Sequence, residues 1–482
     1  MSYLPELGTP IRDFRSMELT PEQEQALRNV SESHLEFVRY ALSRPAFLTK
    51  ASYKALHTPD CMSRDPVQSW PTLVDPPLRA ELESASVGIC RLIKSIPEIV
   101  FEFDAQSISE FYRLDLSFIK HFVLGALREQ NISGAIGRGD FIKGHEGLWC
   151  IEFNIASNLG GLWEALAWEK KIKSLPLIAD YLRKNGMRTQ VTNSFRLMMR
   201  HFVNEVIRFG LPASGPINVA YVLNKTRAEL DSEDSKMGKY LADDYRELMH
   251  EFTPKMEGEL FPCAFDDLNI IDGQLYFAGA PVHLVVECMG GDVPLHVLRC
   301  QQRNQLSVYN GPISYLLCNK LNLAVLSELQ DSGIFADEDQ ELIRRHIPWT
   351  RKLEAGEVDF HGRKVVLPAF LFENRQNLVL KKSISRSGHD VVVGRYGDLA
   401  EWTREIDRAV QEQDWIVQEF IACPPLVYQH GEYGSCPHDV VWGLFVFGDT
   451  YGGAFLRMLP KTSKSAVNAT LGSSDGIVLE LL

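Results

Sequence analysis

The sequence predicts a mixed fold of the α+β and α/β classes, with a helical N-terminal region and several separate groups of strands. Three observations support this prediction. Residues 20–42 carry apolar side chains at helical spacing, residues 138–154 hold two strand-like segments around a glycine turn, and residues 378–460 alternate strands with a helix. At 482 residues and 45% hydrophobic content, the chain is long enough for about three domain-sized units.

The composition excludes some classes of partner. The formal net charge is −13, whereas a nucleic-acid-binding surface is normally basic. No apolar run is long enough to span a bilayer, and the first residues lack a basic start followed by an apolar block. The nine cysteines are dispersed without a CxxC pair, as is typical of reduced thiols in the cytoplasm. We therefore expect a cytoplasmic protein that binds neither nucleic acid nor membranes.

The N-terminal elements are predicted from capping and loop signals. Thr20, Pro21 and Gln23 supply a cap, a first-turn proline and a Gln three positions after the cap, which predicts a helix start. The stretch from His57 to Pro77 is rich in Pro, Asp and Ser and is expected to be a loop.

The middle of the chain mixes strands and helices. Gly273–Phe277 and Val282–Glu287 are predicted strands joined by the turn around Gly279, and Leu316–Leu329 is predicted to be helical. Pro348 and the polar residues after it mark a boundary.

The C-terminal part alternates strand and helix. Asp398 and Glu401 form a capping box ahead of a helix, and the polar segment Lys382–Asp390 is a loop between two strands. The predicted strands are Leu378–Lys381, Val391–Val393, Trp415–Ile421 and two that flank the turn at Asp449–Thr450.

The hairpin around residues 144–147 carries the sharpest functional signal. If its strands pair about that turn, Asp140 lies nearly opposite Glu152, and period-two alternation adds Arg138 and Asn154 to the same face. Facing carboxylates repel each other unless a cation lies between them. Carboxylate and amide oxygens are ligands that Mg²⁺ accepts alongside phosphates and water. The alternative is a surface hairpin whose carboxylates face water and pair with Arg138.

Two other segments have the chemistry to bind an anion. Asn158, Gly160 and Gly161 lead into the helical stretch from Leu162, so free backbone N–H groups could face a ligand, although a tight turn explains them nearly as well. Arg457 interrupts an apolar strand. A buried arginine needs an anionic partner, whereas an arginine that reaches water does not.

Lys381 ends an apolar strand just before a loop with Ser387 and Gly388. Lysine as a point charge, with backbone and hydroxyl donors, suits phosphates, and a solvated hairpin tip is the alternative. The strand at Gln418 and Glu419 could place its backbone beside an adenine edge in an apolar slot, or be an ordinary strand.

Together these segments resemble the ATP-grasp superfamily, and their order resembles its circularly permuted, carboxylate–amine ligase-like branch, related to the ATP-grasp part of glutathionylspermidine synthase. Gly137-Arg-Gly-Asp-Phe-Ile and Cys150-Ile-Glu-Phe-Asn precede the lysine strand here, whereas they follow it in the ordinary order. Tyr309-Asn-Gly-Pro with Asn319-Lys320 resembles the linking α/β region of that branch. Lys382 departs from the family pattern, which usually has proline there, and the loop after it is poor in glycine.

The resemblance implies roles and an organisation. Asp140, Glu152 and Asn154 would be Mg²⁺ ligands. Arg138 and Arg457 would be the catalytic arginines, which stabilise the phosphate and the acyl phosphate. Lys320, Lys381, Ser387, Gly388, Gln418 and Glu419 would bind ATP, and Asn158, Gly160 and Gly161 the substrate. The expected parts are a mainly helical region at 1–106, an ATP-grasp portion with the metal hairpin at 107–210, a linking α/β domain at 211–347 and a nucleotide-binding lobe at 348–482.

The resemblance also implies a reaction. A carboxylate would attack the γ-phosphate of ATP to give an acyl phosphate and ADP, and an amine would then displace phosphate to form an amide or peptide bond. The expected cofactors are ATP and Mg²⁺, and the expected partners are small carboxylates and amines. The alternatives are transfer of an amino acid to a carrier-protein thiol, an adenylating enzyme, and a non-catalytic nucleotide-binding scaffold.

Overall fold

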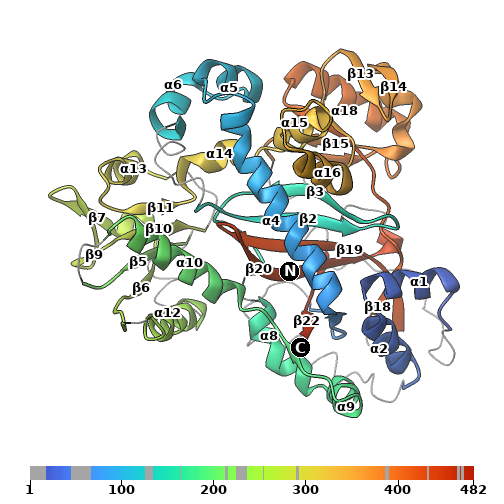
Figure 1. Cartoon of the computed structure of the whole chain (residues 1–482), viewed down its shortest axis with the longest axis horizontal. Helices are drawn as coiled ribbons and strands as arrows, with labels where there is room; N and C mark the ends of the chain where they lie inside the picture. Colours follow the sequence, from blue (N-terminus) through green and yellow to red (C-terminus); the bar gives the residue numbers. More distant parts are fainter. Residues whose placement is uncertain are drawn as a thin grey trace.

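The computed structural model describes residues 18–44, 67–124, 134–162, 164–211, 215–223, 236–252, 254–288, 293–385, 390–430, 434–463, 467 and 472–482. Within them, helices and several sheets alternate along the chain, in agreement with the predicted mixed α and β fold (Figure 1). No described helix combines the length and the apolar character that a membrane crossing would need. No disulfide links the cysteines of the described residues.

A six-stranded antiparallel sheet lies at the centre of the molecule (Figure 1). Its strands alternate residue by residue between two faces, so each strand contributes to two different environments. In spatial order they are β21 (Ser474–Gly476), β20 (Thr450–Pro460), β19 (Gly434–Phe447), β2 (Ile136–Lys143) and β3 (Leu148–Asn154), with β18 (Leu426–His430) also paired to β19.

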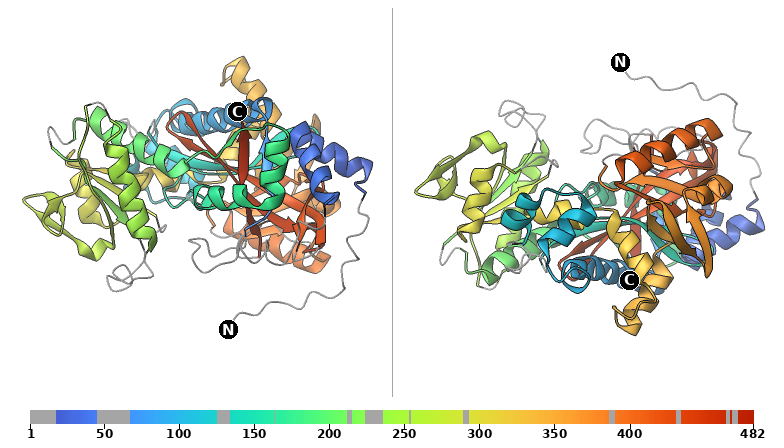
Figure 2. Two further views of the ribbon diagram at one scale, coloured as in Figure 1. Left: turned by 90° about the horizontal axis from the view of Figure 1, so that it is seen from below. Right: turned by 90° about the horizontal axis from the view of Figure 1, so that it is seen from above.

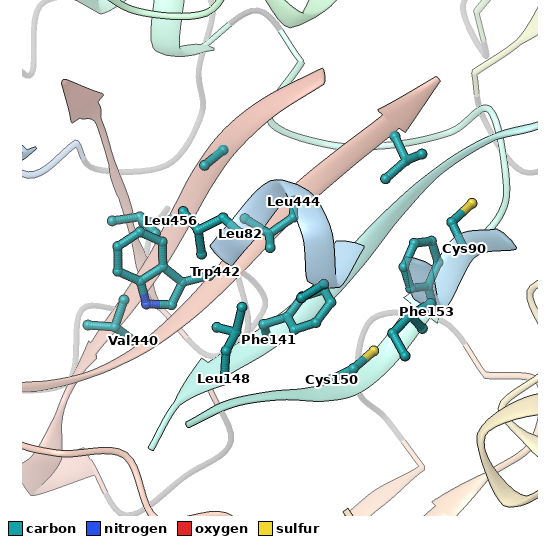
Figure 3. Packing of buried hydrophobic residues seen from close by; sticks show 14 of the residues in the cluster. Leu82, Cys90, Phe141, Leu148, Cys150, Phe153, Val440, Trp442, Leu444 and Leu456 are labelled. Carbon is teal, nitrogen blue, oxygen red and sulfur yellow. The ribbon is translucent and has the colours of Figure 1, made fainter. Parts of the chain in front are cut away.

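One face of this sheet is an apolar core covered by the long helix α4 (Pro76–Ile99). Figure 3 shows Phe141, Trp442 and Leu444 of the sheet beside Leu82 and Cys90 of α4. Because these side chains are almost fully removed from water, this face anchors the sheet.

The N-terminal helices α1 (Pro21–Val30) and α2 (Glu32–Leu42) pack near β18. The predicted start of α1 is confirmed, since Thr20 and Gln23 form the reciprocal capping box. The expectation of a loop up to Pro77 is wrong at its end. The structure has a strand, β1 (Thr72–Val74), and then α4, in which Asp75 is the cap and the two prolines occupy the first turn.

β1 joins a small sheet with the last strand of the chain. It pairs in parallel with β22 (Val478–Leu481), which also pairs with β4 (Thr189–Gln190). This long-range pairing ties the N-terminal region to the C-terminus, so the helical region is not an independent bundle.

A second unit, at one end of the molecule in both views of Figure 2, is built on a four-stranded parallel sheet. Its order is β11 (Ser307–Tyr309), β10 (Leu284–Glu287), β5 (Val219–Val222) and β6 (Leu260–Cys263). The helices α10 (Ser194–Arg208), α12 (Lys236–Met249) and α13 (Leu295–Gln302) belong to this unit.

The predicted strands at 273–277 and 282–287 are present but lie in different sheets. β8 (Gln274–Phe277) pairs with β7 (Leu268–Ile271) and β9 (Ala280–Pro281), whereas β10 pairs in the parallel sheet. The predicted helix at 316–329 is divided into α14 (Ser314–Leu317) and α15 (Leu321–Leu329), with Lys320 at the start of α15.

The third unit contains a four-stranded antiparallel sheet of order β12 (Thr350–Lys352), β17 (Trp415–Glu419), β15 (Leu378–Lys382) and β16 (Val391–Val393). Helix α18 (Leu399–Glu412) is capped by Asp398, as predicted, and buries Trp402 and Ile406 in the core of this unit. The hairpin β13 (Gly356–Phe360) and β14 (Arg363–Leu367) and the short helix α17 (Ala369–Glu373) complete it.

Five further α-helices occur within the described residues. They are α5 (Ala105–Tyr112), α6 (Leu116–Phe118), α8 (Glu164–Ser174), α9 (Pro176–Lys184) and α16 (Asp337–His346).

Candidate functional site

The site is built on the hairpin β2–β3. In its register Asp140 lies opposite Glu152 and Arg138 opposite Asn154, so the predicted face-to-face arrangement is confirmed. The turn is closed by Gly144 N–H donating to the Gly147 carbonyl at 2.7 Å. A register shift directly after Asp140 changes the pairing of the next residues. These four side chains therefore lie on the face of the central sheet opposite the apolar core.

Asp140 is buried between two arginines. Arg138 donates to it through Nε at 2.9 Å and Nη2 at 3.3 Å, and Arg457 donates through Nη2 at 2.6 Å. Burial acts to raise the pKa of the Asp140 carboxyl, but the two guanidinium groups outweigh it and hold the pKa below its ordinary value. Arg457, on β20, thus has the anionic partner that a buried arginine requires.

Glu152 is the more open carboxylate of the pair. Its side chain is 25% exposed and its Oε1 lies 3.2 Å from Lys320 Nζ. Lys320 itself is buried at the start of α15, and its Nζ also donates to the Ser385 carbonyl at 3.5 Å. Lys320 thereby connects β3 with the segment that follows β15.

Lys381 comes from β15 in the third unit. Its Nζ donates to the Ile151 carbonyl and to Gln418 Oε1, both at 2.7 Å, and Gln418 in turn donates to Thr350 Oγ1 at 3.0 Å. Burial, together with the nearby Lys320, lowers the pKa of Lys381 to about 8 against the opposing effect of Glu152. Gln418 therefore holds the lysine in place by its side chain.

These groups surround a cavity of about 500 Å³. Its lining combines charged and amide side chains with aliphatic and aromatic side chains. The polar lining includes Arg138, Asp140, Glu152, Asn154, Asn158, Lys320, Lys381, Gln418, Glu419, Asp439 and Arg457. The apolar lining includes Ile142, Val379, Val391, Val393, Tyr396, Phe420, Ile421, Val440 and Val441. The mixture suits a ligand with a flat apolar part and an anionic part.

The donor set determines whether a magnesium ion fits. Glu152 and Asn154 line the cavity, and their carboxylate and amide groups carry hard oxygens of the kind that suits Mg²⁺. No cluster of three or more His, Cys, Asp or Glu side chains occurs within the described residues. An ion at Glu152 and Asn154 would therefore complete its shell with water and ligand phosphates, as Mg²⁺ commonly does.

The other predicted site residues fall into three groups. Asn158 and Gly160 line the cavity, while Gly161, with φ of +90°, packs against Phe455. Glu419 also lines the cavity and accepts a bond from His361 at 3.0 Å. Ser387 and Gly388 lie outside the described residues.

Two residues at the site were not singled out from the sequence. Asp439 of β19 lines the cavity, with Lys461 Nζ at 3.5 Å, and burial raises the pKa of its carboxyl. Gly443, also on β19, pairs directly with Asp140. A glycine inside an apolar strand often marks a close approach of another group, so Gly443 had a signal in the sequence.

Comparison with known proteins adds information on the fold. No protein-family model and no curated protein matches this chain. Among solved structures, the chain is similar to a glutathione synthetase-like effector (GSS30) from Globodera pallida, solved in its apo form. The TM-score is 0.52 and the identity 13%, and the match covers 96% of this chain and 99% of the other. The likeness therefore extends over nearly the whole length of both chains, and what it shows is a shared, glutathione synthetase-like fold.

Proposed function

We propose that this protein is an ATP-grasp ligase that activates a carboxylate as an acyl phosphate, releases ADP and transfers the acyl group to an amine. The observation that carries the proposal is that four cations, Arg138, Arg457, Lys320 and Lys381, line one cavity together with many aliphatic and aromatic side chains. These cations come from four segments that are distant in sequence, so their meeting at one cavity is a product of the fold and not of a local surface ion pair. The glutathione synthetase-like fold supports the same reaction class by analogy.

Phosphoryl transfer requires the protein to position the reacting groups and to neutralise their negative charge. Phosphoryl transfer places little covalent work on the enzyme and gains most from cations aimed at the phosphate oxygens. Lys381 and Lys320 stand beside Glu152, where they would bind the phosphates, and the two arginines would face the acceptor carboxylate and the transferred group. A magnesium ion held by Glu152 and Asn154 would neutralise phosphate charge.

The apolar part of the cavity would hold the adenine. Val379 and Val393 of the third unit and Val441 of the central sheet line it. Tyr396 and Phe420 add aromatic surface to this slot. Backbone groups near Glu419 would bond the adenine edge, while Asn158 and Gly160 border the end where the carboxylate substrate would enter.

The test is a screen for ADP release over amino acids and amines, with Mg²⁺ present and absent. The proposal predicts Mg²⁺-dependent ADP formation that requires both a carboxylate and an acceptor. AMP formation would indicate an adenylating enzyme, and ADP formation that requires a carrier-protein thiol would indicate the alternative acceptor. ATP binding without any product over the whole screen would replace the ligase with a nucleotide-binding scaffold.

A further inference from the structure

The two carboxylates of the hairpin differ in what their oxygens contact. Both oxygens of Asp140 accept hydrogen bonds from guanidinium groups, Oδ1 from Arg138 and Oδ2 from Arg138 and Arg457. The Asp140 side chain is 6% exposed, whereas the Glu152 side chain is 25% exposed and forms one ion pair, with Lys320, within the described residues. A carboxylate that already accepts three charged hydrogen bonds has little left for a metal, because such bonds are strong and directional.

Gly443, the strand neighbour of Asp140, leaves room for the Arg138 side chain. A Cβ on Gly443 would stand 2.9 Å from Arg138 Cδ, closer than real contacts allow, and 3.3 Å from its Nε, which is a tight contact. The aliphatic part of Arg138 thus lies across Gly443, and its Nη1 continues to the Gly160 carbonyl at 2.9 Å. The glycine gives Arg138 the room to lie flat on the sheet and meet Asp140.

The second arginine, Arg457, has one nitrogen bonded to Asp140 and another without a hydrogen-bond partner among the described residues. Arg457 reaches Asp140 through Nη2 alone. Its Nε is buried and has no hydrogen-bond partner among the described residues. A buried guanidinium N–H without an acceptor is costly, and an anion in the adjoining cavity would supply one.

We infer that Asp140 is a positioning residue that aims Arg138 and Arg457 at an anionic ligand, and that Gly443 provides the space this arrangement needs, while the metal belongs to Glu152 and Asn154. The inference deepens the proposed function and rests on it for the identity of the ligand. It assigns different roles to Asp140 and Glu152, which the sequence predicts to bind the same Mg²⁺ ion.

The experiment compares full-length variants in two measurements that do not need the unidentified carboxylate substrate. Asp140→Asn and Gly443→Ala perturb the arginine arrangement, and Glu152→Gln perturbs the metal position. Asp339→Asn is a matched control, since Asp339 pairs with Arg91 away from the cavity. Gly147→Ala is the second control, because a Cβ there meets nothing within 4 Å. Circular dichroism and thermal unfolding establish that each variant is folded.

The first measurement is the affinity for Mn²⁺ in the presence of ADP, read from the free-ion electron paramagnetic resonance signal. Glu152→Gln is expected to weaken Mn²⁺ binding about tenfold or more, because it removes a charged oxygen ligand. Gly443→Ala is expected to change it less than about threefold, because both proposed oxygen ligands of the ion remain. Asp140→Asn also removes a charge directly opposite Glu152, so it is expected to change Mn²⁺ binding, but clearly less than Glu152→Gln does. Equal loss in Asp140→Asn and Glu152→Gln would overturn the inference and return Asp140 to the metal set.

The second measurement is the nuclear magnetic resonance of the arginine Nε–H groups, assigned by Arg138→Lys and Arg457→Lys. Asp140→Asn and Gly443→Ala should both move the Arg138 resonance and speed its exchange with water, and Glu152→Gln should not. An Arg138 resonance that stays unchanged in both variants would refute the positioning role. The second measurement needs no ligand, so it tests the inference even if the wild-type protein does not bind Mn²⁺ and ADP. Absence of that binding would count against the proposed function and not against the inference. Gly443→Ala keeps the test open if Asp140→Asn does not fold.

Discussion

The same strands form both faces of the central sheet, but one face packs in the apolar core and the other carries the candidate site. Phe141, Trp442 and Leu444 point into the core against α4 (Figure 3), while Asp140 and Gly443, their immediate neighbours in sequence, belong to the site face. Period-two alternation alone makes this division possible. A rigid apolar face allows the opposite face to hold buried charges in fixed positions, which a loop could not do as well.

Removal of a large side chain from the core face should have the largest effect on stability. Trp442 is 1% exposed, so Trp442→Ala leaves a cavity and is expected to lower the free energy of unfolding by about 3–5 kcal/mol. Urea unfolding measures it. A loss below about 1 kcal/mol would mean that this face anchors the sheet less than its burial implies.

Removal of a carboxylate from the site face should affect turnover more than stability. Glu152→Ala is expected to reduce ATP turnover about a hundredfold or more, since it would remove the carboxylate proposed to hold Mg²⁺ at the phosphates. Because Glu152 is partly exposed but pairs with the buried Lys320, the free energy of unfolding should fall by about 1–3 kcal/mol. Steady-state ADP release and urea unfolding on the same sample test both statements, and full activity would remove Glu152 from the site.

The buried lysine of the site should make nucleotide binding depend on pH. The pKa of Lys381 is about 8, so its charge is lost as the pH rises through that value, and affinity for ADP should fall above it. The lowered pKa means that the charged form costs stability below about pH 8, and this cost is relieved as the pH rises toward the ordinary lysine value. Calorimetric titration from pH 6.5 to 9.5 tests the binding; Lys381→Arg should flatten the profile, because arginine stays charged.

The next residue along β15 offers the smallest expected effect. Lys382 points to the opposite face from Lys381 and pairs with Glu412 at 2.9 Å in partly exposed surroundings. Lys382→Ala should change the free energy of unfolding by less than about 1 kcal/mol, as for other exposed ion pairs. ADP affinity should be unchanged in the same calorimetric assay. A large loss of affinity would show that the two faces of β15 are coupled.

The local parts of the site could be predicted because their causes are local. The turn at 144–147 and the alternation on either side of it place Asp140 opposite Glu152 without reference to the rest of the chain. The capping signals at Thr20 and Asp398 predict helix starts for the same reason. The missed start of α4 at Pro76 came from a proline pair that suits both a loop and a first helical turn.

Contacts between distant segments could not be predicted. The sequence left Arg457 as either exposed or paired, and only the β2–β19 and β19–β20 pairings together bring it to Asp140. Likewise, the separation of β8 from β10 depends on which strands are near, not on their composition. Propensity is nearly the same for a strand in either sheet.

The pattern of residues along the chain thus established which side chains share a face of the hairpin and that an acidic pair meets there. Folding in three dimensions decided the partner of each acid, two arginines for Asp140 and a lysine for Glu152. The reason is physical: alternation is a property of consecutive residues, whereas a buried charge is matched by whichever opposite charge the assembled strands and helices bring within a few ångströms.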